Sequence, residues 1–301
     1  MNSKRVEQKA LIGGIFVNFL MCCAGVLVYN ATQIEALFVD AYFSAITLIS
    51  GVFSLIVSKI SARRSKKFPE GFFVLEPLYS LFQSLLTIVL LAVSLIKVSL
   101  KAYRYFVYGQ GSLMNVEPVI PYEIVMVLLS LGLSYYYSRQ NNKINHLSMM
   151  LFSEAKGTLV DGLMSLGIGI FAFILFFIKQ SSPFGFLRYT GDFFITSLLI
   201  MLTIKMPFQV IKRAFNEICG GLLLDQDMQK WIENCLKKHL SEIVSIKSCL
   251  IYKVGMSFRI DVFIKGKAKL IDNEKLSRKK VLILKELSKK LEFIHLEFCL
   301  C

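Results

Sequence analysis

The chain has 301 residues, 55% of them hydrophobic, and its mean hydropathy is +0.58. Soluble globular proteins are about 45–50% apolar, so this composition excludes an ordinary soluble protein and indicates an integral membrane protein. The formal net charge is +14, but no recognition motif accompanies it, so we expect a lipid bilayer and no nucleic acid as a partner.

Six apolar segments follow one another along the chain, and most are long enough to cross a bilayer. They cover residues 10–34, 40–58, 77–96 (continuing as helix toward 105), 118–138, 149–178 and 192–204. The first is too long for a cleavable signal peptide, and the last is the weakest. The sequence therefore predicts an α-helical membrane protein with a six-helix transmembrane domain over residues 1–206.

Positive charge alternates between the connecting segments. Lysines and arginines precede the first span and follow the second, fourth and sixth, whereas the loops near Gln33, Gly111 and Pro183 are poor in them. Because positively charged loops stay in the cytoplasm, this pattern predicts a multi-pass protein of the cell membrane (plasma or inner) with both termini cytoplasmic.

Residues 207–301 are predicted to form a separate cytosolic α+β domain. The segment DQDMQKWIENCLKKHL has apolar residues at helical spacing, and two strand-like segments follow it with a turn near Gly255. A second amphipathic helix and the alternating strand EFIHLEFCL complete an α-β-β-α-β order, which favours a small open sheet with helices on one face. The seven cysteines form no C-x-x-C pair and are expected to be reduced thiols.

Acidic residues interrupt several of the apolar spans, and two of them are candidates for a shared site. Asp40 lies near the start of the second span and Asp161 about midway along the fifth. Acids inside a membrane are costly and by default functional, so we expect a shared cation site, with a helix-end structural role as the alternative. Glu154 lies two turns before Asp161 on the same face, and it is either an intake-side acid or the partner of Lys156 or Lys143.

The chain resembles the cation diffusion facilitator family in three segments. VDAYFS followed by ARRSKKFPEGFFVLEP is similar to the family's second-span aspartate motif and next loop. SEAKGTLVDGLMSLGIGI is similar to its fifth-span signature, and MPFQVIKRAFNEICGGLLLD to its exit from the sixth span. The resemblance implies a homodimeric exporter of divalent metal cations driven by proton exchange, with a ferredoxin-like or metallochaperone-like cytosolic domain. An enzyme is the least favoured interpretation, because the sequence shows no nucleophile–base set, phosphate-binding loop or zinc-hydrolase motif, and we expect no tightly bound cofactor.

The resemblance also implies a transport site made of two i,i+4 pairs. The second-span pair falls on Asp40 and Ser44, the Asp-x-x-x-Ser form of one branch of the family, and the fifth-span pair falls on Gly157 and Asp161. Ser44 is either a ligand or a hydroxyl that bonds a backbone carbonyl. Gly157 allows either close helix approach or access for the metal.

This site would be rich in oxygen and free of nitrogen. Carboxylate and hydroxyl oxygens suit hard ions such as manganese, so we expect manganese or iron(II) to compete with zinc as the transported cation. The alternative is a non-transporting membrane partner or dimerisation protein with a degenerate site. In the cytosolic domain, His295 and Glu297 fall on metal-binding positions of the family, and the terminal Cys299 and Cys301 add two thiols, but we assign no site there.

Overall fold

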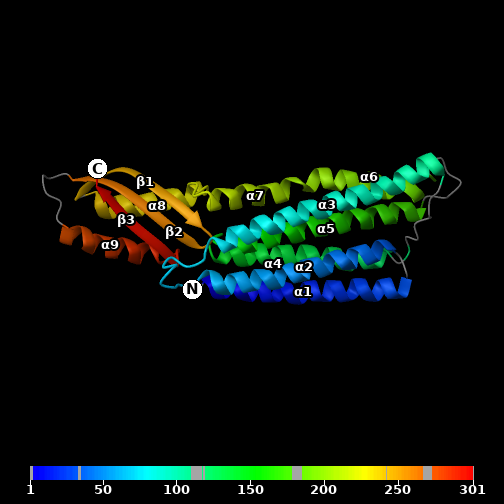
Figure 1. The fold of residues 1–301 in the computed structure, drawn as a ribbon, viewed down its shortest axis with the longest axis horizontal. Coiled ribbons are helices and arrows are strands. Elements are labelled where there is room, and N and C mark those ends of the chain that lie inside the picture. Colours follow the sequence, from blue (N-terminus) through cyan, green and yellow to red (C-terminus); the bar gives the residue numbers. More distant parts are fainter. Residues whose placement is uncertain are drawn as a thin grey trace.

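The structure is a computed structural model, and it describes residues 3–32, 35–109, 117, 119–177, 185–241, 243–266 and 273–300. Figure 1 shows an elongated molecule with a bundle of long helices at one end and a small sheet with two helices at the other. The start of α1 lies at the end of the bundle that faces the sheet.

Seven helices make up the described part of the bundle. They are α1 (Ser3–Thr32), α2 (Glu35–Ser61), α3 (Leu75–Tyr108), α4 (Val119–Lys143), α5 (Met149–Phe177), α6 (Leu187–Thr203) and α7 (Lys205–Ile218). Within the described residues, five helical runs are long and apolar enough to cross a membrane, with α6 and α7 counted as one run, and α2 adds a shorter apolar stretch, Thr47–Ser61. The predicted multi-pass helical membrane protein is confirmed.

The sixth predicted span differs from the structure at both ends. Helix α6 begins at Leu187, five residues before the predicted start, and α7 follows α6 after Ile204. Helix α7 packs against α3 and α5. Because α7 runs from Lys205 to Ile218, it crosses the predicted domain boundary between residues 206 and 207. The division into two domains stays a prediction.

The C-terminal region has the predicted α-β-β-α-β order. Its elements are α8 (Gln226–Leu240), β1 (Val244–Val254), β2 (Ser257–Gly266), α9 (Asn273–Leu287) and β3 (Phe293–Leu300). Strand β2 lies between the others, antiparallel to β1 and parallel to β3. Helices α8 and α9 contact each other as well as the sheet, so they cover the same face, as predicted.

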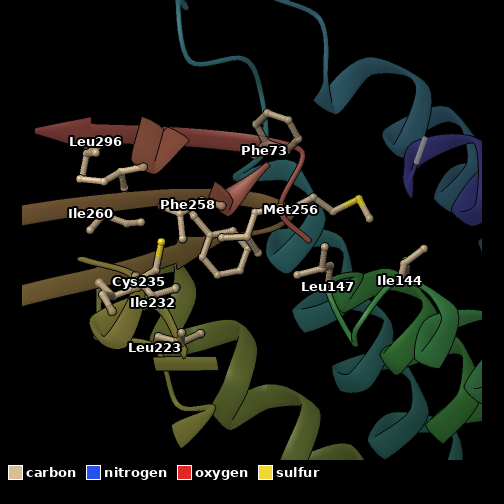
Figure 2. Packing of buried hydrophobic residues seen from close by; sticks show 14 of the residues in the cluster. Phe73, Ile144, Leu147, Leu223, Ile232, Cys235, Met256, Phe258, Ile260 and Leu296 are labelled. Atoms are coloured by element: carbon tan, nitrogen blue, oxygen red, sulfur yellow. The ribbon is translucent and has the colours of Figure 1, made fainter. Parts of the chain in front are cut away.

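The largest hydrophobic core is shared by the sheet region and the end of the bundle. It includes Phe73 and Leu147 from the bundle and Met256 and Phe258 from the β1–β2 hairpin. Figure 2 shows these side chains meeting where the sheet faces the helices. The ring centroids of Phe73 and Phe293 lie 4.7 Å apart. The sheet region is therefore packed onto the bundle through apolar contacts.

A buried ion cluster lies at the same junction. Lys4 Nζ is 2.7 Å from Glu7 Oε1 and 2.5 Å from Glu76 Oε1, and all three side chains are buried. The hydroxyls of Ser58 and Ser148 also donate to the Glu7 carboxylate. The cluster joins α1 to α2, to α3 and to the residue before α5. Its hydrogen bonds and opposite charges offset the cost of removing these groups from water.

The turn between β1 and β2 packs closely against this ion cluster. Gly255 has φ +58°, and a Cβ there would lie 2.7 Å from both Glu76 Oε2 and the carbonyl oxygen of Phe73. Gly255→Ala is expected to cost about 1–2 kcal/mol of backbone strain and about 1–3 kcal/mol more from overpacking. The matched control is Gly220→Ala, since Gly220 has φ +70° but no atom within 4 Å of its Cβ position. In detergent, Gly255→Ala is expected to lower the melting temperature more than Gly220→Ala does. Equal decreases in the two variants would contradict the close contact at Gly255.

Candidate metal-binding cavity

A cavity of about 280 Å³ lies inside the helical bundle. Helices α1 to α6 all contribute to its wall. Serine and threonine hydroxyls supply most of its polar lining, and Glu154 and Asp161 supply carboxylates. Lys97 supplies the one ammonium group among the lining residues that the structure describes. Such an oxygen-rich wall suits a cation that keeps part of its hydration shell.

The cavity brings together three of the four predicted site residues. Ser44, from α2, faces the same space as Gly157 and Asp161, from α5. Asp40 lies one turn before Ser44 on α2, but its side chain is outside the described residues. Residues four apart share one helix face, so this backbone position is the one that the i,i+4 pairing requires.

Glu154 is buried in the cavity wall and accepts a hydrogen bond from Tyr79. The Tyr79 hydroxyl lies 2.8 Å from Glu154 Oε1 and 2.9 Å from Ser50 Oγ. The same hydroxyl lies 2.9 Å from the Ser50 carbonyl oxygen. Because a carboxylate is the stronger acceptor, the one phenol proton is assigned to Glu154, and Tyr79 accepts from the serine hydroxyl. This hydrogen-bond chain connects α2, α3 and α5 across the bundle.

The interpretation of Glu154 as a lysine partner is wrong. Its described hydrogen-bond partners are the uncharged side chains of Tyr79, Gln83 and Ser54. Lys156 Nζ instead lies 5.9 Å from the centroid of the Phe152 ring. Glu154 lies near the end of α5 that faces the sheet region, and Asp161 lies two turns farther along the helix. The rise of 1.5 Å per residue separates their Cα atoms by about 10 Å. The cavity therefore has one carboxylate near its sheet-side end and one deeper in the bundle.

Gly157 is not required by close helix packing. A Cβ at this position would meet Gln83 Nε2 at 3.7 Å, an ordinary contact distance. The lack of a side chain at Gly157 instead leaves open space in the cavity that Asp161 also lines. This fits the interpretation that the glycine gives the metal access to the site.

Gly157→Ala is expected to leave the melting temperature in detergent nearly unchanged, because the site has room for a methyl group. Gly167→Ala is the matched control on the same helix, since its Cβ would lie 2.2 Å from Leu199 Cδ1, and overpacking costs about 1–3 kcal/mol. A Gly157→Ala protein as unstable as the Gly167→Ala protein would contradict the open wall.

The described C-terminal strand does not assemble a metal site around His295. Its Nε2 atom is 2.9 Å from Glu297 Oε1, and both side chains are about half exposed. Arg259 lies 3.8 Å from the other Glu297 oxygen, and no third metal-binding side chain joins them among the described residues. Cys301 is outside the described residues. The contacts fit a surface ion pair.

A family model for the cation efflux transmembrane domain matches residues 11–219. The chain belongs to the cation efflux family. The match takes in more than two thirds of the chain and every residue that lines the cavity. A search among curated proteins finds no match. Membership confirms the predicted resemblance to cation diffusion facilitators and supports metal cation efflux as the function. The family is not normally enzymatic, in agreement with the predicted lack of catalysis.

Proposed function

We propose that this cation efflux protein exports divalent metal cations in exchange for protons through a site formed by Asp40, Ser44, Gly157 and Asp161. The observation that supports it most directly is the shared cavity that Ser44, Gly157 and Asp161 line. A cation bound between the two carboxylates would stabilise their ionised forms, because opposite charges attract each other more strongly inside a bundle of low dielectric constant than in water.

Proton exchange follows from the same electrostatics. Two carboxylates close together repel each other when both are ionised, and either a divalent cation or a proton relieves that repulsion. The cation and the proton therefore compete for Asp40 and Asp161. When the cavity opens to a side with a higher proton concentration, protonation of these groups releases the metal. This coupling needs no histidine and no resident cofactor.

Glu154 extends the pathway toward the sheet region. Its carboxylate lines the same cavity as Asp161 and is held by Tyr79. In the predicted orientation the sheet region is cytosolic, so of the two carboxylates described in the cavity wall Glu154 lies nearer the cytosolic side. The oxygen ligands favour manganese and iron(II) more than a histidine site would, although zinc generally binds the same ligands more tightly.

The proposal is tested by ion flux in sealed vesicles. Purified protein is reconstituted into liposomes, and uptake of zinc, manganese, iron(II) and magnesium is measured across a pH gradient together with proton movement. We expect divalent cation uptake coupled to proton efflux, with measurable manganese or iron(II) transport. Metal uptake without proton movement would contradict antiport, strict zinc transport would contradict the ligand argument, and no cation flux would contradict export.

We further propose that the chain works as a homodimer whose C-terminal region is of the metallochaperone-like type and faces the cytosol. A hydrogen bond supports the same side of the membrane for the start of α1 and the C-terminal region: the backbone N–H of Ser3 donates to Glu292 Oε2 at 2.6 Å. The loops proposed to lie outside, near Gln33, Gly111 and Pro183, fall in parts of the chain outside the described residues.

This orientation predicts the labelling of single introduced cysteines. In intact cells, Gly111→Cys is expected to react with a membrane-impermeant thiol reagent, whereas Lys66→Cys, in the basic loop after α2, is expected to react only after the cells are lysed. The unsubstituted protein controls for its native thiols. Protection at position 111 with labelling at position 66 would reverse the orientation.

A further inference from the structure

A second group of metal-binding side chains lies far from the cavity, between α8 and α9. Among the described residues it is the one group in which three candidate ligands from His, Cys, Asp and Glu come together. The ligand atoms of Cys235, His239 and Glu286 all lie within 4.8 Å of one another. His239 Nε2 is 2.6 Å from Glu286 Oε2.

The local sequence explains this arrangement. Cys235 and His239 are four residues apart on α8, so they share one helix face, and Glu286 lies on α9, which packs against α8. Cys235 belongs to the hydrophobic core, where Figure 2 shows it near Ile232. The side chains of His239 and Glu286 are 17% and 29% exposed. The group thus runs from the core to the surface, and its outer side is open to a water ligand.

We propose that Cys235, His239 and Glu286 form a cytosolic binding site for a zinc-like divalent cation. Thiolate, imidazole and carboxylate groups are each zinc ligands, and zinc sites with three protein ligands hold water in the fourth position. In a tetrahedral zinc site neighbouring ligand atoms lie about 3.3–3.7 Å apart, as its bond lengths require. Binding therefore requires the imidazole and carboxylate, now 2.6 Å apart, to separate by about 1 Å, whereas all three ligand atoms already lie within 4.8 Å of one another.

The charges around the group allow such binding. Lys238 Nζ approaches Glu286 Oε1 at 3.2 Å and Oε2 at 3.4 Å, and His239 contacts Oε2. Glu286 can bind a cation through Oε2 once the lysine moves away from that oxygen, and the lysine side chain is 66% exposed and free to turn into solvent. Hydrogen bonds from His239 and Lys238 lower the pKa of Glu286, so its carboxylate is ionised at neutral pH.

Binding must displace the thiol proton. Burial, with a smaller contribution from the Glu286 charge, raises the pKa of Cys235 to about 11, so the thiol is protonated when no metal is bound. The balanced step is formation of the sulfur–metal bond with release of one proton to water, and it involves no oxidation or reduction. The bound cation then links α8 to α9 through three side chains.

Cobalt(II) is the probe that separates this site from the transport cavity. A cobalt–thiolate bond gives a charge-transfer absorption band in the near ultraviolet, and the described lining of the transport cavity contains no cysteine. Full-length protein in detergent, kept reduced by a phosphine, is titrated with cobalt(II). We expect the band in the wild type, its loss in Cys235→Ala, and its retention in Cys249→Ala, the matched control for a thiol of the same region.

A second variant keeps the fold while removing one ligand. His239→Gln retains an N–H donor for Glu286, so the link between α8 and α9 is preserved in the metal-free protein. Even the loss of an indirect contact to a metal ligand weakens affinity about 10–100-fold, so we expect His239→Gln to weaken cobalt binding at least tenfold with an unchanged metal-free melting temperature. Wild-type affinity in this variant would overturn the proposal. So would a wild-type protein without the band, or a band that survives in Cys235→Ala.

Discussion

Replacing Lys4 with methionine is expected to destabilise the protein by about 3–5 kcal/mol, because removing one partner of a buried ion pair leaves an uncompensated charge. Lys4 Nζ contacts Glu7 Oε1 at 2.7 Å and Glu76 Oε1 at 2.5 Å. Both carboxyl side chains are fully buried, so water cannot replace the ammonium group. Methionine keeps the length and apolar stem of lysine, and the variant therefore tests the charge rather than the packing.

The measurement is the melting temperature of the purified protein in detergent. Lys9→Met is the matched control, since Lys9 is exposed on the same helix, and it is expected to melt like the wild type. Lys4→Met combined with Glu76→Gln is expected to recover part of the loss, because the two changes act on one contact and do not add. A Lys4→Met protein as stable as the Lys9→Met protein would contradict the structural role of the cluster.

Asp161→Asn is expected to abolish metal transport while leaving expression and folding nearly intact. Asparagine has almost the same shape, but it cannot carry the charge that attracts the cation. At an effective dielectric constant of about 20, two unit charges about 4 Å apart interact by about 4 kcal/mol. Losing such a contribution lowers cation affinity roughly a thousandfold.

Liposome flux of the saturating wild-type cation measures this effect. Ser130→Ala is the control, because Ser130 also lines the cavity but is not among the proposed ligands, and it is expected to transport at a rate close to the wild type. Flux by Asp161→Asn at the Ser130→Ala level would remove Asp161 from the site. A misfolded Asp161→Asn protein would instead favour the structural interpretation of this acid.

The sequence predicted most of the fold because its signals are local. Apolar length predicts the long helices, and alternation with turn signals predicts the small sheet. The predicted start of the sixth span is wrong because Arg188, Gly191 and Asp192 lower the hydropathy of the segment where α6 begins. The helix extends over these residues through tertiary contacts: Tyr189 stacks on Tyr105 with ring centroids 4.8 Å apart, and Gly191 lies where any Cβ would collide with Phe171.

The candidate cavity was predicted in part. The i,i+4 spacing was sufficient to predict that Gly157 and Asp161 share a helix face, and the resemblance added the second-span pair. The Tyr79–Glu154 hydrogen bond joins residues 75 positions apart, and the Lys4–Glu76 pair joins residues 72 apart. Periodicity within one helix carries no information about such contacts between helices. The i,i+4 spacing of Cys235 and His239 was a usable signal, but Glu286 could not be assigned to it without the packing of α8 on α9.

The measurement that tests the central claim most directly is a double-mutant cycle on equilibrium metal binding with Asp40→Asn, Asp161→Asn and both together. Each protein is purified in detergent with Cys235→Ala in the background, so that the thiol between α8 and α9 does not contribute. Binding is followed calorimetrically with the best-transported cation. If Asp40 and Asp161 share one cation, each single variant loses that binding and the double variant loses no more. An Asp40→Asn protein that folds, binds the cation and transports it like the wild type would contradict the claim.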